Sequence, residues 1–170
     1  FPAKATCAHV TTWNSNASIK FRTDVAMMGK LGFDIKLNDM SGDDLTYCQN
    51  AVKNYKRLRP AIMEGDMYRL VSPYDGPHAS TQFVSKDKKT AVIFAFDIYP
   101  RFGDKRYNTR LDGLDANRKY RVKEINMMPG QNSSLEGNNK TYSGEYLMNV
   151  GLNLFTGNKL HSRVIEVTAE

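Results

Sequence analysis

The pattern of the sequence changes at Arg59-Pro60. Before this dipeptide, the apolar residues are spaced as strand, helix, strand and helix. After it, nearly every apolar run is short and alternates as in strands joined by turns. Alternating strands and helices are typical of a parallel sheet covered by helices, and a parallel pair needs neighbours on both edges. We therefore expect an α+β chain in which the end of a larger parallel fold is joined to an antiparallel β-domain.

Two strand–helix units are predicted before the proline. Strands are expected over residues 5–12 and 33–37, and helices over 18–31 and 41–59. Gly32 stands where a helix C-terminal cap belongs, Ser41 is a natural N-cap for the second helix, and Pro60 is expected to end that helix. Because strand–helix–strand crossovers are right-handed, the two strands should lie side by side and parallel.

The rest of the chain has the pattern of an antiparallel β-domain. The strongest apolar run is 90–99, and a polar turn at 86–89 should join it to the run 80–85 as a hairpin. Another hairpin is expected between 107–111 and 119–125. Further short elements are predicted as strands over 66–71 and 163–168 and a turn of helix over 143–149. Strands at this spacing are typical of a sandwich of antiparallel sheets.

The composition argues against several classes of function. Of the 170 residues 41% are hydrophobic, enough for a packed core, and no apolar run approaches the ~18 residues of a membrane span. The net charge of +6 comes from scattered basic residues, so we expect a solvated surface, with no nucleic-acid and no membrane partner. Cys7 and Cys48 are expected to be buried free thiols rather than a disulfide. Cys7 and His9 lack the further ligands that zinc needs, so no metal and no cofactor are predicted.

Four blocks of the sequence carry a family resemblance. They are Phe1-Pro2 with Thr6-Cys7-Ala8-His9-Val10; Phe21-Arg22 through Val25-Ala26-Met27 to Gly29-Lys30-Leu31-Gly32; Leu111-Asp112-Gly113-Leu114-Asp115 followed by Tyr120-Arg121-Val122; and Tyr142-Ser143-Gly144-Glu145-Tyr146-Leu147-Met148-Asn149-Val150-Gly151-Leu152. In order and spacing, over nearly the whole chain, they resemble the C-terminal part of α-galactosidases of glycoside hydrolase family 36. Thr6-Cys7 replaces the family's usual Met-Gly, and Trp13 stands where a proline is common.

The resemblance implies a fold and an activity for a parent protein. Residues 1–62 would be the last two βα units of a (β/α)8 barrel, and residues 63–170 an antiparallel β-sandwich domain packed on it. The parent would be a retaining α-galactosidase that hydrolyses terminal α-galactosyl residues, with a galactosyl oligosaccharide as its partner. Two parallel strands with bare edges should also seek cover, as a homo-oligomer or by contact with the missing half of the barrel.

A retaining glycosidase needs two carboxylates about 5–5.5 Å apart, which in barrel enzymes lie at the carboxyl ends of strands. Asp24 is expected inside the first helix, and Asp34 at the start of the second strand, the wrong end. Asp39 follows that strand at the correct end, where a role in a turn is expected. The family's two catalytic Asp motifs lie upstream of the segment that matches Phe1. No catalytic residue is therefore assigned, and this chain alone is expected to be inactive.

Candidate substrate-binding residues follow the first strand. Thr12, Trp13 and Asn14 would lie at the functional face, where the Trp13 ring could stack on a sugar. The alternative is that Trp13 packs against the rim of the barrel. His9, within the strand, is expected to be a hydrogen-bonded core histidine.

Other interpretations stay open. A non-catalytic carbohydrate-binding or structural β-sandwich module would show exposed aromatic residues in a row, whereas Phe94 and Phe96 point to one face and Tyr99 to the other, as in a core. A transferase acting on galactosyl oligosaccharides could use the same fold. His78 and His161 lie in predicted loops and are given no role.

Overall fold

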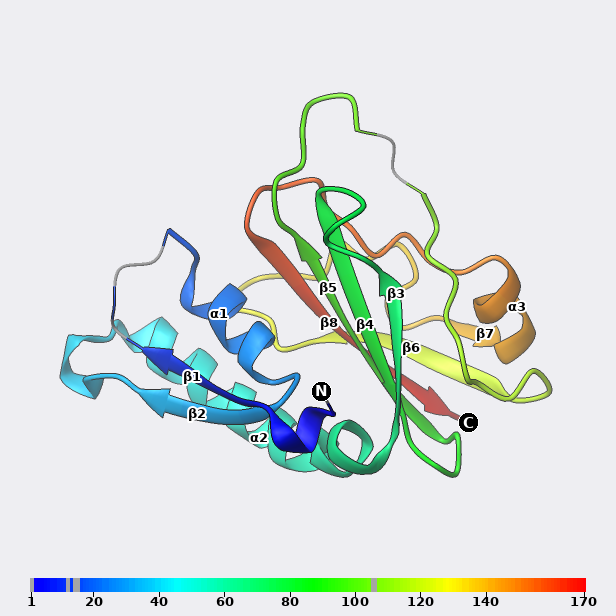
Figure 1. Cartoon of the computed structure of the whole chain (residues 1–170), viewed down its shortest axis with the longest axis horizontal. Coiled ribbons are helices and arrows are strands. Elements are labelled where there is room, and N and C mark those ends of the chain that lie inside the picture. The colour runs from blue at the N-terminus through cyan, green and yellow to red at the C-terminus, as the bar shows by residue number, and fades with distance from the viewer. Residues whose placement is uncertain (1, 12, 14–15, 105–106) are drawn as a thin grey trace.

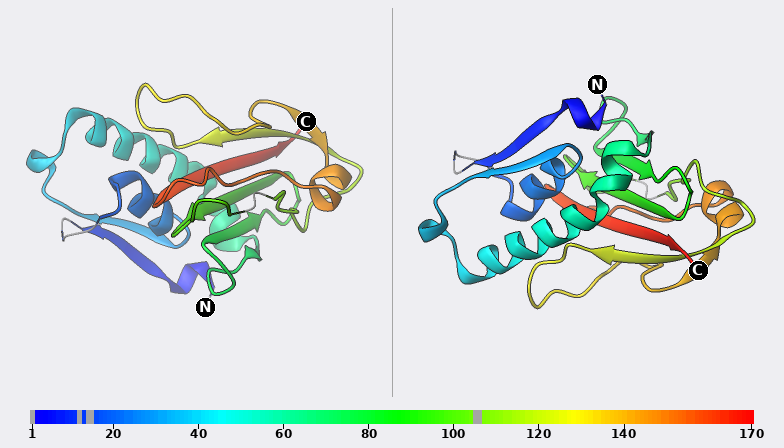
Figure 2. Two further views of the ribbon diagram at one scale, coloured as in Figure 1. Left: turned by 90° about the horizontal axis from the view of Figure 1, so that it is seen from above. Right: turned by 90° about the horizontal axis from the view of Figure 1, so that it is seen from below.

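A computed structural model of the chain describes residues 2–11, 13, 16–104 and 107–170, and its elements form four layers (Figures 1 and 2). The outer layer is a parallel pair, β1 (Cys7–Thr11) and β2 (Lys30–Asp34). Helices α1 (Ile19–Ala26) and α2 (Gly42–Glu64) lie between this pair and a six-stranded sheet. An irregular layer with the short helix α3 (Gly144–Asn149) covers the other face of that sheet. Two short 3-10 turns, Ala3–Ala5 and Leu37–Asp39, flank the parallel pair.

The parallel pairing of β1 and β2 is confirmed, with a register that runs from Cys7 opposite Lys30 to Thr11 opposite Asp34. The prediction of Gly32 as a helix cap was wrong, because α1 ends at Ala26 and Gly32 lies inside β2. A Cβ atom on Gly32 would come 2.7 Å from Cδ2 of His9 on the neighbouring strand. The glycine is therefore needed for close approach between strands and not for a helix end.

The second helix starts as predicted and ends later. The Ser41 hydroxyl accepts a hydrogen bond from the backbone N–H of Asp44 at 3.1 Å, which confirms the N-cap. Pro60 lies inside α2, so the prediction that it ends the helix was wrong. A proline removes one backbone donor. The next turn nevertheless stays helical, because the side chains of Ala61 and Ile62 are buried in the core.

The remaining strands form one antiparallel sheet in the order β3-β4-β5-β8-β6-β7. They are β3 (Asp66–Val71), β4 (His78–Val84), β5 (Thr90–Asp97), β6 (Lys119–Ile125), β7 (Thr141–Ser143) and β8 (His161–Ala169). The predicted β4–β5 hairpin and its turn at 86–89 are confirmed. Strand β5 is buried on both faces, which explains its continuous apolar run.

The antiparallel arrangement is as expected, but two details differ. Residues 107–111 do not pair with β6 as predicted; in the described part of the chain they make one bridge, between Thr109 and Leu152. Leu111 is buried because its segment packs on α3, where its N–H bonds to the carbonyl of Leu147 at 3.0 Å. The hydrogen-bond ladders of the described residues join all six strands into a single sheet, not into two facing sheets.

Each face of the sheet supports its own apolar core. On the helix side the core includes Met27, Tyr47, Leu58, Phe94, Phe96 and Val164. On the opposite side it includes Ile93, Tyr120, Leu147, Leu154 and Ile165. Phe94 and Phe96 are therefore core residues, as expected, while Tyr99 lies beyond the end of β5 and is exposed. Burying such side chains stabilises each layer by about 1.5–3 kcal/mol per residue.

A buried polar network joins the helices to the sheet. The Oδ2 atom of Asp24 accepts hydrogen bonds from Nζ of Lys20 at 2.6 Å and from the hydroxyl of Ser162 at 2.7 Å. Its Oδ1 atom accepts from the hydroxyl of Tyr47 at 2.9 Å and from the amide of Asn126. Burial, reinforced by the Asp24 charge, raises the pKa of Tyr47, so its hydroxyl stays protonated and donates. One carboxylate thus connects α1, α2, β8 and the segment after β6.

Both cysteines are free, as predicted, but only Cys48 is buried and Cys7 is exposed. Within the described ranges, no helix is both long enough and apolar enough to cross a membrane.

Candidate functional site

The carboxyl ends of β1 and β2 meet at one edge of the parallel pair. Thr11 and Asp34 are the last residues in register, and parallel sheets covered by helices bind their ligands at this end. The prediction that Asp34 stands at the wrong end was therefore incorrect. Strand β2 starts at Lys30, three residues earlier than expected, so Asp34 ends it. Asp39 lies in the short turn that follows, and both side chains are exposed.

A hollow of about 410 Å³ lies beside this end of β1. Its walls include His9 and Thr11 of the strand, Trp13 of the following loop, and Phe21 and Arg22 of α1. The side chain of Trp13 is 80% exposed, so its ring has room to stack on a ligand and is not packed against the described residues. The other two candidate substrate-binding residues, Thr12 and Asn14, lie outside the described residues.

Arg22 holds the end of β1 in place. One of its guanidinium nitrogens, Nη1, donates a hydrogen bond to the carbonyl oxygen of Thr11 at 2.5 Å. The N-cap Ser18, whose hydroxyl accepts from the N–H of Phe21 at 3.1 Å, fixes where α1 starts and hence where Arg22 points. Arg22 belongs to one of the four blocks that carry the family resemblance, but no role was predicted for it.

The three aspartates considered as catalytic candidates lie in two environments. Asp24 accepts hydrogen bonds within the buried network, whereas Asp34, at the end of β2, and Asp39, in the turn that follows, are exposed. Among the described residues, no group of three or more His, Cys, Asp or Glu side chains is arranged to hold a metal ion.

A second polar site lies in the sheet, at a position predicted to be a loop. His78 is the first residue of β4 and is buried, with its Nδ1 atom 2.9 Å from Oδ1 of Asp97. Its ring stacks on Phe155 with centroids 4.4 Å apart. Asp97 in turn accepts hydrogen bonds from the N–H and the hydroxyl of Thr156 at 2.9 and 2.8 Å. The signal was present in the hairpin register, which pairs His78 with Asp97 once the ladder is extended to its end.

His161, the other histidine that was given no role, opens strand β8 and is half-buried. Burial, and next the Lys20 charge, lower the pKa of its imidazole. Its neutral form is therefore favoured in the folded chain.

Comparison with known proteins shows a likeness along nearly the whole chain. The model of the glycosyl hydrolase family 36 C-terminal domain matches residues 78–167, and the melibiase model matches residues 1–65. The chain therefore belongs to glycosyl hydrolase family 36.

The relatives are α-galactosidases. Alpha-galactosidase 2 of Hypocrea jecorina is 31% identical over 171 residues, covering 97% of this chain and 21% of the relative. Alpha-galactosidase AgaA of Geobacillus stearothermophilus is 30% identical over 135 residues, covering 76% of this chain and 18% of the relative. The chain thus spans about a fifth of the length of the relatives it matches.

Solved structures of the family share the fold. The crystal structure of the family 36 α-galactosidase AgaB from Geobacillus stearothermophilus has a TM-score of 0.84 at 28% identity and covers 99% of this chain and 22% of its own. A complex of an AgaA variant with raffinose gives a TM-score of 0.83 at 27% identity, with coverages of 99% and 22%.

Proposed function

We propose that this chain forms the C-terminal part of a retaining α-galactosidase that hydrolyses terminal α-galactosyl residues of oligosaccharides. Residues 1–62 would supply the last two βα units of a (β/α)8 barrel, and residues 63–170 its C-terminal β-domain, built on the single antiparallel sheet. The observation that carries the proposal is the continuous likeness to α-galactosidases over 97% of the chain. The parallel β1–β2 pair, followed by helices that pack on a separate antiparallel sheet, supports the proposed division.

The substrate would be a galactosyl oligosaccharide, since structures of related AgaA variants are complexes with raffinose and stachyose. Thr12, Trp13 and Asn14 would contact it from the loop after β1, and Arg22 would hold the start of this loop. An exposed indole beside a hollow suits the apolar face of a sugar ring. No nucleic acid, membrane or cofactor is needed for this role.

Catalysis would require a pair of carboxylates, and we assign neither member of that pair to the described residues of this chain. A retaining mechanism uses a nucleophile and an acid/base about 5–5.5 Å apart. We therefore expect the 170-residue chain to be inactive and the longer gene product to hydrolyse an aryl α-galactoside with retention of the anomeric configuration. Release of the aryl group measures activity, and NMR of the first-formed sugar anomer measures retention. Hydrolysis by the short chain, or a β-anomer as first product, would contradict the proposal.

Substitution of Trp13 tests the substrate contact. In the longer gene product, Trp13→Ala should raise the KM for raffinose about two- to tenfold, because an aromatic contact of about 0.5–1.5 kcal/mol is lost. Trp13→Phe is the matched control, since it keeps a ring and should lose less. Equal KM values for all three proteins would place Trp13 outside the substrate site.

The bare edges of β1 and β2 should also be covered. We expect the 170-residue chain to self-associate, or to bind an added polypeptide that carries the remaining barrel units. Light scattering at rising concentration measures this association. A chain that stays monomeric at all concentrations and does not bind the added polypeptide would contradict this expectation.

A further inference from the structure

The loop after β5 presents an unusual set of side chains to solvent. Tyr99 and Phe102 are exposed large aromatic residues, and Phe102 is fully exposed. The loop lies beside the one that precedes β4, because the N–H groups of Ile98 and Tyr99 both bond to the carbonyl of Pro77, at 2.8 and 3.3 Å. In Figure 1 this loop projects from the end of the sheet, apart from the carboxyl ends of β1 and β2.

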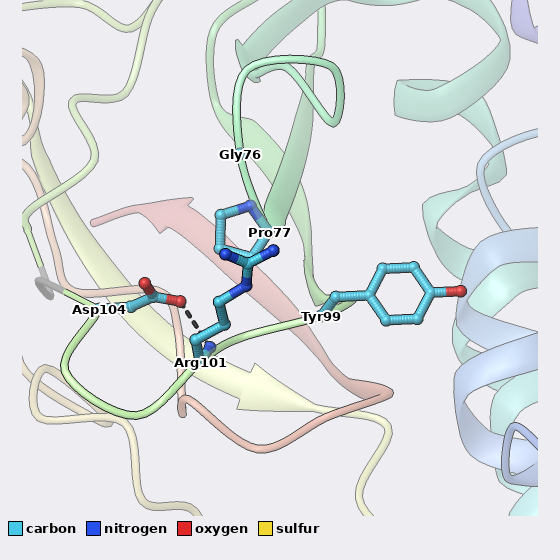
Figure 3. Close-up of a pocket in the computed structure, with 5 residues that line it drawn as sticks. All are labelled: Gly76, Pro77, Tyr99, Arg101 and Asp104. Carbon is cyan, nitrogen blue, oxygen red and sulfur yellow. Dashed lines mark hydrogen bonds between the residues drawn. The ribbon is translucent and has the colours of Figure 1, made fainter.

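The loop has a defined shape. The backbone N–H of Arg101 donates to Oδ2 of Asp104 at 2.6 Å, and the N–H of Asp104 returns a bond to the carbonyl of Arg101 at 3.2 Å. Figure 3 shows the first of these bonds, with the Arg101 guanidinium beside Pro77 and the Tyr99 ring pointing away from it. This bond uses the backbone of Arg101, and among the described residues its guanidinium has no hydrogen-bond or ion-pair partner.

Two hollows flank this loop. One, of about 360 Å³, lies between Tyr99, Pro77 and Arg101 (Figure 3). The other, of about 400 Å³, is lined by Arg101 and Phe102 and has His78 and Phe155 in its wall. Both volumes fall in the range of small-molecule sites, about 300–1,000 Å³.

The second hollow has a built polar wall. His78 is 6% exposed, and its orientation is fixed by the stack on Phe155 and by the contact between Nδ1 and Asp97. Asp97 is anchored by the backbone N–H groups of Thr156 and Gly157, so the pair cannot turn away easily. In the part of the chain that the structure describes, no hydrogen bond uses the other ring nitrogen, Nε2, which leaves it free for a ligand.

These groups select for one kind of ligand chemistry. Among the described lining residues, Arg101 and Asp104 contribute one charge of each sign, so the wall offers an anion no excess of positive charge. Aromatic rings beside a guanidinium, a carboxylate and an imidazole suit a neutral molecule that has an apolar face and several hydroxyl groups. We propose that this hollow is a saccharide-binding site on the β-domain, separate from the end of β1. The site goes beyond the proposed hydrolysis and does not rest on it.

The 170-residue chain itself tests the site, since no turnover is needed. Raffinose and stachyose are titrated while amide shifts are followed by NMR, with inorganic phosphate as the anionic probe. We expect both sugars to shift amides of residues 78, 101 and 155, and phosphate to leave them unchanged. Phe102→Ala and Arg101→Ala should each weaken sugar binding at least about fivefold, because each removes one direct contact.

Tyr74→Ala is the matched control, because Tyr74 is 97% exposed on the neighbouring loop and does not line this hollow. It should bind both sugars as the parent chain does. His78→Phe keeps a ring for the stack on Phe155 but removes both nitrogens, and it should also weaken binding. Absence of sugar binding, phosphate shifts at these amides, or equal affinities in all four variants would each overturn the proposal.

Discussion

Replacement of Asp24 by asparagine tests whether one buried carboxylate holds the helices to the sheet. Asp24 is 0% exposed and accepts four hydrogen bonds, from Lys20, Tyr47, Asn126 and Ser162. Asparagine keeps the size but leaves the Lys20 ammonium, whose side chain is 8% exposed, without its counter-charge. The asparagine also replaces one acceptor oxygen by an NH2 group, which cannot accept a hydrogen bond from the donors that face it. Breaking a buried ion pair from one side costs about 3–5 kcal/mol, so we expect the free energy of unfolding to fall by at least about 3 kcal/mol.

Urea unfolding of the 170-residue chain, followed by circular dichroism, measures this loss. With a slope of about 2 kcal/mol per molar urea, 3 kcal/mol lowers the midpoint by about 1.5 M. Lys86→Met is the matched control because it breaks an ion pair with Asp66 in which both side chains are more than half exposed. Such a surface pair is worth about 0–1 kcal/mol, so its midpoint should move by less than about 0.5 M.

The double variant Lys20→Met with Asp24→Asn separates charge from hydrogen bonding. If the unpaired Lys20 ammonium is the main cost, the free energy of unfolding should fall less in the double variant than the sum of its decreases in the two single variants. A midpoint for Asp24→Asn equal to that of Lys86→Met would refute the reasoning, since the carboxylate would then contribute no more than an exposed one.

Three further predictions concern thiols, pH and backbone. Burial raises the pKa of Cys48 to about 11, so at pH 8 only about one Cys48 side chain in a thousand is a thiolate. A thiol reagent should therefore modify the exposed Cys7 fast and the buried Cys48 slowly, and two equal rates would contradict this. Because the pKa of His161 is lowered in the folded chain, the unfolded chain binds a proton at this residue first as the pH falls. The contribution of His161 to the free energy of unfolding should therefore be present above about pH 6.5 and be lost toward acid. Between pH 7 and pH 5 the urea midpoint of His161→Gln should fall less than that of the parent chain, and an equal fall would contradict the argument. Gly151→Ala would place a Cβ 2.1 Å from a backbone carbonyl oxygen, whereas Gly103→Ala meets nothing within 4 Å. Both glycines have positive φ, so each substitution should lower the free energy of unfolding by about 1–2 kcal/mol. Gly151→Ala should lower it further because of the steric clash, and equal thermal midpoints for the two variants would refute the steric argument.

Features decided by near neighbours could be predicted from the sequence. The predicted N-cap at Ser41 depends on a residue three positions on, and the β4–β5 hairpin depends on a short polar turn. Ser18 and Ser143, where helical segments were predicted to start, form N-caps of the same kind. The parallel β1–β2 pair follows from the handedness of one crossover. In the cap and the hairpin the pattern and the partner lie within a few residues, whereas the parallel pair follows from a general rule of chain connection.

Features that depend on residues far away in the sequence were predicted wrongly. Gly32 resembles a helix cap until His9, more than twenty residues earlier, is known to lie against it. Pro60 resembles a helix end because the burial of the following turn is not visible in the local pattern. The position of Asp34 in the site was predicted wrongly for a related reason. Strand β2 starts three residues earlier than predicted, so Asp34 lies at its carboxyl end and not at its start.

The two faces of α1 explain why its apolar stripe did not predict its buried face. Phe21 and Val25 are apolar and four residues apart, a spacing that favours a common buried face, yet the buried side chains include Lys20, Thr23 and Asp24. A helix face normally buries polar residues only when they are paired, and here the network of Asp24 provides the pairing. Val25 is exposed and lines the hollow beside β1, which is the side that further barrel units would cover under the proposed function. Helix α1 thus meets the sheet through paired polar side chains and through Phe21, whose ring packs edge-to-face on Phe96 of β5 with centroids 5.4 Å apart, while Val25 stays exposed.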